Sequence, residues 1–251
     1  MYLEFYLLKG VKIVYKNYIF DLYGTLVDIS TNEEKSLVWE KLSLFYSYNN
    51  APYETLEIKD KYHELIKKYI SISTTVDHPD FPVEYIFEEL YLLKNVSPSQ
   101  ELIKNTCHFF RILSMDKLNL YNGVIDLLKT LKLNNKKIYL LTNAQKVFTS
   151  YEINLLGLTN YFDDILYSSE SKVCKPNKLF FNELINKHNL KINESIMIGN
   201  DYFCDIEPAL DLGLDTLYIH SNISPDLKYP INSTYKILDG NFLNVKSLIL
   251  K

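Results

Sequence analysis

Several apolar runs of the chain end in polar residues that could do chemistry together. Asp21 follows the run 18–20, and Gly24 then predicts a sharp turn just past a strand end. The other candidates are Thr142 and Asn143, Lys175, and the group Asn200, Asp201 and Asp205. Acids gathered at one place repel one another unless a cation or Lys175 offsets their charge. These residue types therefore suit a site that holds a divalent cation.

Each of these residues alone has an ordinary structural explanation. Asp21 could cap a turn, Thr142 could be a strand-end hydroxyl, and Lys175 could be a surface lysine. Asp201 and Asp205 could be acids at a helix N-terminus. In a parallel sheet, however, all of these positions meet at the carboxyl edge, where open α/β folds place their sites. One shared site explains the combination better than separate accidents do.

The composition is that of an ordinary globular protein with a large core. The chain has 251 residues, of which 47% are apolar and 23% charged, which suits one core domain plus an insertion. A net charge of -4 and a single arginine, Arg111, give no electrostatic footprint for nucleic acid. We therefore expect a small-molecule substrate, no nucleic-acid partner, and a monomer or homodimer.

The sequence also indicates the cellular compartment in which we expect the protein. Charged residues interrupt the apolar N-terminal extension 1–13, so we predict neither a signal peptide nor a membrane span. Three cysteines are too few for a disulfide framework and indicate a reducing compartment. We expect a cytoplasmic protein with no membrane partner.

Strand and helix patterns alternate in the second half of the chain. Strands are predicted at 137–141, 164–168, 195–199, 215–219 and 235–238, with helices near 124–131, 147–151, 177–189, 205–212 and 242–250. Together with the first strand, this alternation predicts an α/β fold with a doubly wound parallel sheet and right-handed crossovers. We assign residues 14–29 and 116–251 to this core.

Residues 30–115 show helical rather than strand periodicity. Apolar stripes at helical spacing run through 38–45, 58–69, 83–91 and 103–110, and prolines fall between them. We interpret this segment as a small helical-bundle cap domain above the carboxyl edge of the sheet. Its aromatic side chains are expected to form the core of the bundle rather than to surround a ligand.

The order of the motifs resembles that of the haloacid dehalogenase superfamily of hydrolases, most of which are phosphatases. The matching residues are the DLYGT run from Asp21, Thr142-Asn143, Lys175 before Pro176, and the GNDYFCD run that ends in Asp205. The resemblance extends from about Val14 to the end of the chain and includes a helical cap after the first strand. It implies a Rossmann-like core.

This resemblance implies a role for each candidate residue. Asp21 is the expected nucleophile, which would become an aspartyl-phosphate. Thr142 and the main chain at Asn143 would hydrogen-bond phosphate oxygens, and Lys175 would neutralise the Asp21–phosphate pair. The expected ligands of Mg²⁺ are Asp21, the carbonyl of Tyr23, and the group Asn200, Asp201 and Asp205.

The residue two positions after the nucleophile departs from the phosphatase pattern. Phosphatases carry an Asp there as general acid and base, whereas this chain has Tyr23, whose phenol is a weak acid near neutral pH. His78 is our candidate for the missing proton donor and a substrate contact. It is flanked by Asp77 and Asp80 in a predicted cap loop, and neighbouring carboxylates favour the charged form of a histidine.

The fourth motif departs from the family pattern as well. The usual Gly-Asp is replaced by Gly199-Asn200-Asp201. Either Asn200 takes the metal position as a neutral oxygen ligand, or Asp201 reaches it with a small shift of the backbone. The sequence leaves both possibilities open.

Two other functions compete with a phosphatase. Haloacid dehalogenases carry the same first motif and need no metal, but their pattern includes a cap arginine where this chain has Glu40. A non-catalytic binding protein on the same scaffold is also possible, because a fold alone does not fix a function. The retained Asp21, Thr142 and Lys175, with the paired acids, favour a Mg²⁺-dependent phosphohydrolase that acts on a small phosphorylated metabolite.

Overall fold

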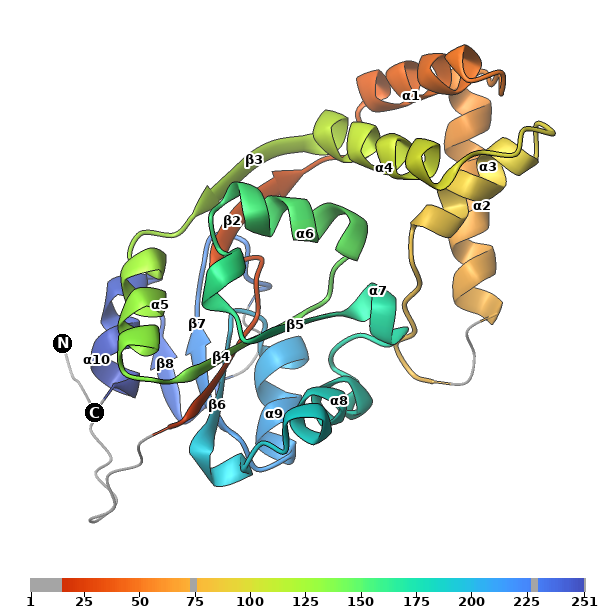
Figure 1. Ribbon diagram of the computed structural model, residues 1–251. Coiled ribbons are helices and arrows are strands. Elements are labelled where there is room, and N and C mark those ends of the chain that lie inside the picture. Colours follow the sequence, from red (N-terminus) through yellow and green to blue (C-terminus); the bar gives the residue numbers. More distant parts are fainter. Residues whose placement is uncertain (1–14, 73–75, 227–229, 251) are drawn as a thin grey trace, which may run out of the picture.

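A six-stranded parallel sheet forms the centre of the molecule. The structure is a computed structural model that describes residues 15–72, 76–226 and 230–250, so the extension 1–13 lies outside the described residues. The sheet order is β5-β4-β1-β6-β7-β8 (Figure 1). Its strands are β1 (Asn17–Phe20), β4 (Lys137–Thr142), β5 (Asp164–Tyr167), β6 (Ser195–Gly199), β7 (Asp215–Ile219) and β8 (Tyr235–Ile237). The predicted α/β fold is confirmed.

Helices cover both faces of this sheet. They are α5 (Val124–Leu133), α6 (Lys146–Leu155), α7 (Ser168–Ser171), α8 (Lys178–His188), α9 (Glu207–Asp211) and α10 (Val245–Ile249). Successive residues of a strand point to opposite faces. Tyr18 and Phe20 of β1 accordingly pack in one apolar cluster with α5 and α10, whereas Ile19 packs in another with α8 and α9.

The strand order brings the predicted site residues to neighbouring strands. β1 pairs in parallel with β4 on one side and with β6 on the other. The three carboxyl ends carry Asp21, Thr142 and Asn200, so these residues meet where the strand order reverses.

Four helices pack together apart from the sheet (Figure 1). They are α1 (Ser36–Tyr48), α2 (Thr55–Ile72), α3 (Glu84–Leu92) and α4 (Gln100–Ser114). Their buried aromatic side chains, among them Trp39, Tyr62 and Phe110, form a third apolar cluster, as the periodicity predicts. Val147 and Phe148 of α6 also pack in this cluster. The boundaries of a separate cap domain at residues 30 and 115 therefore stay a prediction.

A two-stranded antiparallel ribbon joins these helices to the sheet, and the sequence analysis missed it. β2 (Val27–Thr31) pairs with β3 (Met115–Leu120). Residues 30, 31 and 115, at the two ends of the segment predicted to be helical, therefore lie in strands. Both strands are largely half-buried or exposed, so they lack the buried apolar run that identified the other strands.

Residues 77–81, which precede α3, lie against the loops of the core. We call these residues the strap. The main-chain N–H of Cys174 donates to the carbonyl of His78 at 2.9 Å, and the N–H of Asp80 donates to the carbonyl of Lys172 at 3.2 Å. Asn177 adds a bond from its Nδ2 to the carbonyl of Asp77 at 2.6 Å. The strap is thus paired with the loop that carries Lys175.

The carboxylate of Asp80 strengthens this attachment. Its Oδ2 accepts from Ser168 Oγ at 2.6 Å, and its Oδ1 accepts from Gln145 Nε2 at 3.2 Å and from the N–H of Phe81 at 2.8 Å. The side-chain oxygen of Gln145 also accepts a hydrogen bond from the N–H of Val83 at 2.8 Å. A half-buried carboxylate with three donors is well satisfied.

In the part of the chain that the structure describes, no helix is both long and apolar enough to cross a membrane.

Phe110→Ala should destabilise the helical cluster strongly. The ring of Phe110 is fully buried and lies 5.7 Å from that of Trp39 and 5.3 Å from that of Tyr62. Loss of such a ring costs about 3–5 kcal/mol of unfolding free energy. This loss of unfolding free energy can be measured by urea unfolding followed by the fluorescence of Trp39, the only tryptophan. Ile112→Ala on the same helix, at a side chain that is 66% exposed, should cost less than about 0.5 kcal/mol.

Asp80→Asn should weaken the pH dependence of stability. Burial raises the pKa of the Asp80 carboxyl, partly offset by the hydrogen bonds from Ser168 and Phe81. Between the unfolded value of about 3.9 and the raised folded value, the folded state binds more protons, so the free energy of unfolding falls as pH rises. Urea titrations across that interval should show a smaller fall in the variant. Asp77→Asn, at an exposed residue of the strap, should behave like wild type, and identical profiles for all three proteins would contradict the assignment.

Candidate active site

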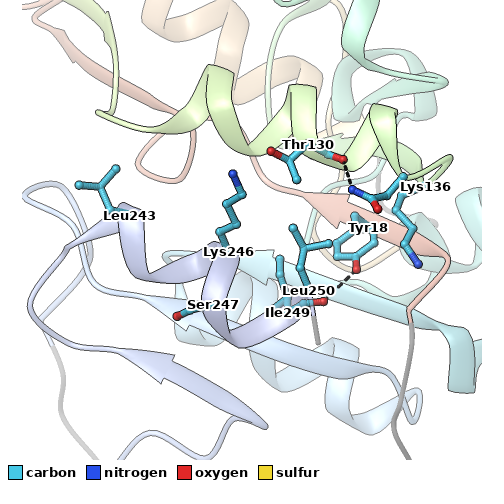
Figure 2. Close-up of a pocket in the computed structure, with 9 residues that line it drawn as sticks. Tyr18, Thr130, Lys136, Leu243, Lys246, Ser247, Ile249 and Leu250 are labelled. Atoms are coloured by element: carbon cyan, nitrogen blue, oxygen red, sulfur yellow. Dashed lines mark hydrogen bonds between the residues drawn. The ribbon is translucent and has the colours of Figure 1, made fainter.

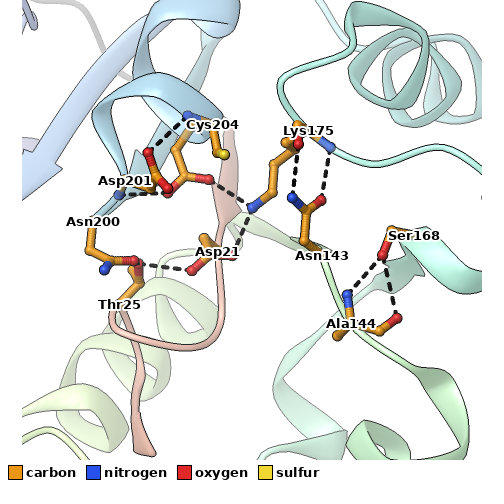
Figure 3. Close-up of polar contacts among 10 residues, drawn as sticks. Asp21, Thr25, Asn143, Ala144, Ser168, Lys175, Asn200, Asp201 and Cys204 are labelled. Carbon is orange, nitrogen blue, oxygen red and sulfur yellow. Dashed lines mark hydrogen bonds and ion pairs between the residues drawn. The ribbon is translucent and has the colours of Figure 1, made fainter. Parts of the chain in front are cut away.

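Lys175 joins two carboxylates inside the site (Figure 3). Its ammonium donates to Asp21 Oδ1 at 2.7 Å and to Asp205 Oδ1 at 2.7 Å, and its side chain is only 2% exposed. Burial alone would lower the pKa of Lys175, but the Asp205 and Asp21 carboxylates raise it, so the group stays charged. Burial raises the pKa of Asp205, and the ammonium of Lys175 opposes that rise.

A tight turn after β1 brings the Asp21 loop close to the end of β6. Gly24 has a φ of +86°, and a Cβ there would lie 2.2 Å from Asn200 Nδ2, so the turn requires glycine. Thr25 Oγ1 lies 3.2 Å from Asp21 Oδ2 and 3.2 Å from Asn200 Oδ1. The hydroxyl of Thr25, which the sequence analysis gave no role, therefore bridges the nucleophile candidate and the amide.

Asn200 and Asp201 have different partners. The amide nitrogen of Asn200 lies 3.3 Å from Ser224 Oγ, which leaves its oxygen on the side of Asp21. Asp201 Oδ1 instead accepts from the N–H groups of Phe203 and Cys204, at 2.9 and 3.0 Å. It thereby caps the π-helical turn η3 (Tyr202–Ile206). Of the two possibilities left open by the sequence, this geometry favours Asn200 as the residue beside Asp21.

The end of β4 supplies a hydroxyl and a clamp. Among the described residues, Thr142 Oγ1 is buried without a hydrogen-bond partner. Asn143 holds both main-chain polar groups of Lys175, because its Oδ1 accepts from the N–H at 2.8 Å and its Nδ2 donates to the carbonyl at 2.9 Å. The side chain of Asn143 thus fixes Lys175, a role that the motif comparison did not suggest.

The phenol of Tyr23 is bonded to α6. It donates to Glu152 Oε2 and lies 2.9 Å from Thr149 Oγ1. Burial raises the pKa of Tyr23 and the negative charge of Glu152 raises it further, so the phenol is an even weaker acid than usual. The phenol is therefore unsuited to replace the missing Asp, and the metal contact of the Tyr23 carbonyl stays a prediction.

His78 lies in the strap, beside the fourth motif. Its ring contacts that of Phe203 at a centroid distance of 6.4 Å, two residues from Asp201. The carboxylate of its neighbour Asp80 accepts hydrogen bonds from Ser168 and Gln145 of the core. The role of His78 as a proton donor stays a prediction.

The oxygen atoms around Asp21 suit a magnesium ion. Two carboxylates, Asp21 and Asp205, lie with the amide oxygen of Asn200 around Lys175 and Thr25. Mg²⁺ in enzymes is commonly held by one or two carboxylates together with substrate phosphate and water. No group of three or more His, Cys, Asp or Glu side chains suited to a metal occurs among the described residues, so such a site would depend on the neutral oxygen ligands.

A cavity of about 580 Å³ lies elsewhere, beside β1 and between α5 and α10 (Figure 2). Tyr18 donates to the carbonyl of Ile249 at 2.9 Å, and Lys246 is paired with Asp126 at 2.9 Å. Polar groups that line this cavity are thus engaged within the protein, and it does not touch the predicted site residues.

Comparisons with known proteins agree with this geometry. The model of the haloacid dehalogenase-like hydrolases matches residues 15–213. A glyceraldehyde 3-phosphate phosphatase of Methanocaldococcus jannaschii is 29% identical over 125 residues, which is 47% of this chain and 55% of the relative. The chain spans about half the length of the curated relatives it matches first.

Solved structures show the same fold at low identity. The putative hydrolase YfnB of Bacillus subtilis, whose structure was solved with magnesium bound, is 20% identical with a TM-score of 0.55, over 94% of this chain and 99% of that one. A 2-haloacid dehalogenase of Pseudomonas syringae is 14% identical with a TM-score of 0.64, over 93% and 97%. Because the family model covers most of the chain and the motifs meet at one sheet edge, this protein belongs to the haloacid dehalogenase-like hydrolases.

Proposed function

We propose that this hydrolase is a Mg²⁺-dependent phosphohydrolase that acts on a small phosphorylated metabolite. The observation that carries the proposal is the buried Lys175 ammonium between Asp21 and Asp205. The adjacent strand β4 ends in Thr142, whose buried hydroxyl has no hydrogen-bond partner among the described residues. A cation between carboxylates and a free hydrogen-bond donor suit a dianionic phosphate. The relative named glyceraldehyde 3-phosphate phosphatase supports the same substrate class.

In the proposed reaction, one oxygen of Asp21 attacks phosphorus and the bond between phosphorus and the alcohol oxygen breaks. Lys175 offsets the charge of the Asp21–phosphate pair, and Thr142 with the main chain at Asn143 binds phosphate oxygens. Mg²⁺, held by Asp21, Asn200, Asp205 and the Tyr23 carbonyl, would act as a Lewis acid on the phosphate. Water then hydrolyses the aspartyl-phosphate, which releases phosphate and restores Asp21.

The departing alkoxide needs a proton. Tyr23 is unsuited to give it, because its phenol is bonded to Glu152. His78 is our candidate, since the strap holds it beside Phe203 and the fourth motif. This assignment predicts that good leaving groups need His78 less than poor ones do.

A dehalogenase is the less favoured alternative. The fold similarity to a 2-haloacid dehalogenase does not decide activity at 14% identity. The dehalogenase pattern includes a cap arginine that receives the halide, whereas the only arginine of this chain, Arg111, is paired with Glu152 at 2.5 Å. A non-catalytic binding protein would show turnover with neither substrate class.

Asp21→Asn should abolish Mg²⁺-dependent hydrolysis of p-nitrophenyl phosphate, because the amide keeps the shape but lacks the attacking charge. We expect a loss of at least about a thousandfold in kcat, as for other covalent nucleophiles. Asp28→Asn, in the same motif but paired at the surface with Lys117, is the matched control and should keep wild-type activity.

The same assay separates the alternatives. Turnover of 2-chloropropionate without Mg²⁺, and none of phosphate esters with it, would establish the dehalogenase. Phosphatase activity retained by Asp21→Asn, with deamidation excluded, would remove Asp21 as the nucleophile. Calorimetry should detect Mg²⁺ binding in the presence of inorganic phosphate.

His78→Ala should reduce activity selectively toward poor leaving groups. General acid catalysis is worth about 10²–10⁴-fold for such substrates and little for p-nitrophenolate, so the slope of log kcat against leaving-group pKa should steepen. His63→Ala removes a histidine of α2 that lies 3.6 Å from Glu34, and it should leave the slope unchanged. An equal loss across the series in His78→Ala would show a binding or structural role instead.

A further inference from the structure

The only arginine of the chain forms a largely buried ion pair between two helices. Arg111 of α4 donates from Nε to Glu152 Oε1 of α6 at 2.5 Å and from Nη2 to Oε2 at 3.3 Å. The two side chains are 15% and 6% exposed. A bidentate pair of this kind fixes the orientation of the guanidinium relative to the carboxylate as well as the distance between them. It connects the helical cluster to the core at a point where little water can screen the charges.

Glu152 is shared with the loop of the proposed nucleophile. The same carboxylate accepts from the phenol of Tyr23, two residues beyond Asp21. The guanidinium of Arg111 lies 5.9 Å from the centre of the Tyr23 ring and 5.3 Å from that of Phe148. One chain of contacts therefore runs from α4 through Glu152 to Tyr23.

The loop that follows Asp21 is stiff enough to transmit this constraint. The N–H groups of Leu26 and Val27 donate to the carbonyl of Leu22 at 2.8 and 2.9 Å, and the N–H of Asp21 donates to the carbonyl of Ile198 in β6 at 2.9 Å. Leu22 is fully buried. A displacement of Tyr23 would therefore disturb the main chain at Asp21 rather than be absorbed by a flexible segment.

We propose that Arg111 is a positioning residue, which through Glu152 and Tyr23 holds Asp21 in attacking geometry only while α4 lies against α6. The residue that replaces the usual acid is then a support for the nucleophile loop, governed by the helical segment. The expected changes in kcat rest on the proposed function. The expected effect of Arg111 on the order of the loop after Asp21 does not.

Variants of Tyr23 and Arg111, the two ends of this chain of contacts, test the inference. Tyr23→Phe keeps the ring and removes only the hydroxyl. We expect kcat for p-nitrophenyl phosphate to fall about tenfold with KM within about twofold, because the hydroxyl supports the position of Asp21 and is not proposed to bind substrate. Arg111→Met should lower kcat at least as much. The double variant should be no worse than Arg111→Met, because both changes break one chain of contacts.

A second contact between the same helices provides the matched control. The ammonium of Lys104 on α4 lies 4.9 Å from the ring centre of Tyr151 on α6, next to Glu152 but on no path to Tyr23. Lys104→Met should leave kcat at the wild-type value. Multiplicative losses in the double variant, or equal losses in Lys104→Met and Arg111→Met, would overturn the proposal in favour of general packing.

Hydrogen exchange separates this inference from the proposed function. Arg111→Met should speed exchange at the amides of Asp21, Leu26 and Val27, measured by mass spectrometry of peptides from that loop, whereas Lys104→Met should not. The measurement needs no substrate and no metal. Faster loop exchange in a protein that hydrolyses no phosphate ester would support the coupling and reject the phosphatase. Unchanged exchange in Arg111→Met would reject the coupling.

Discussion

The ammonium of Lys175 is the interaction on which the site depends. Asp21 and Asp205 are both buried, and two carboxylates so close together repel one another unless a cation lies between them. Lys175 supplies that charge at 2.7 Å from each, and its main chain is fixed by the side chain of Asn143. The loop that carries the lysine is therefore held from within the core before any substrate arrives.

The sheet leaves little freedom in how these groups meet. Adjacent parallel strands end at one edge, and the small residues at their ends let the loops approach closely. A Cβ at Gly24 would collide with Asn200, and a Cβ at Gly199 would lie 2.3 Å from Asp205 Oδ2. These two glycines are required because the side chains of Asn200 and Asp205 fill the space beside them.

The helical segment contacts the core through the apolar packing of Val147 and Phe148 of α6 and through polar contacts at the loops that hold the candidate site residues. The strap pairs with the Lys175 loop, and Arg111 with Glu152 reaches Tyr23. Polar, hydrogen-bonded contacts can open and close at lower cost than an extended apolar interface. Movement of the helices would thus alter the surroundings of both Lys175 and the loop that follows Asp21.

The sequence alone determined the alternation of strands and helices, the helical character of the insertion and the meeting of Asp21, Thr142, Lys175 and Asp205, because periodicity and parallel order fix which residues share an edge. It did not reveal the ribbon of β2 and β3, whose half-exposed residues pair only with each other across a long separation.

Tertiary structure also decided where individual side chains point. The carboxylate of Asp201 caps η3, whereas the amide oxygen of Asn200 lies on the side of Asp21. The phenol of Tyr23 donates to Glu152, which is 129 residues away in the sequence. No local pattern encodes these choices, since each depends on which donors a distant segment brings within about 3 Å of a buried group that must be satisfied.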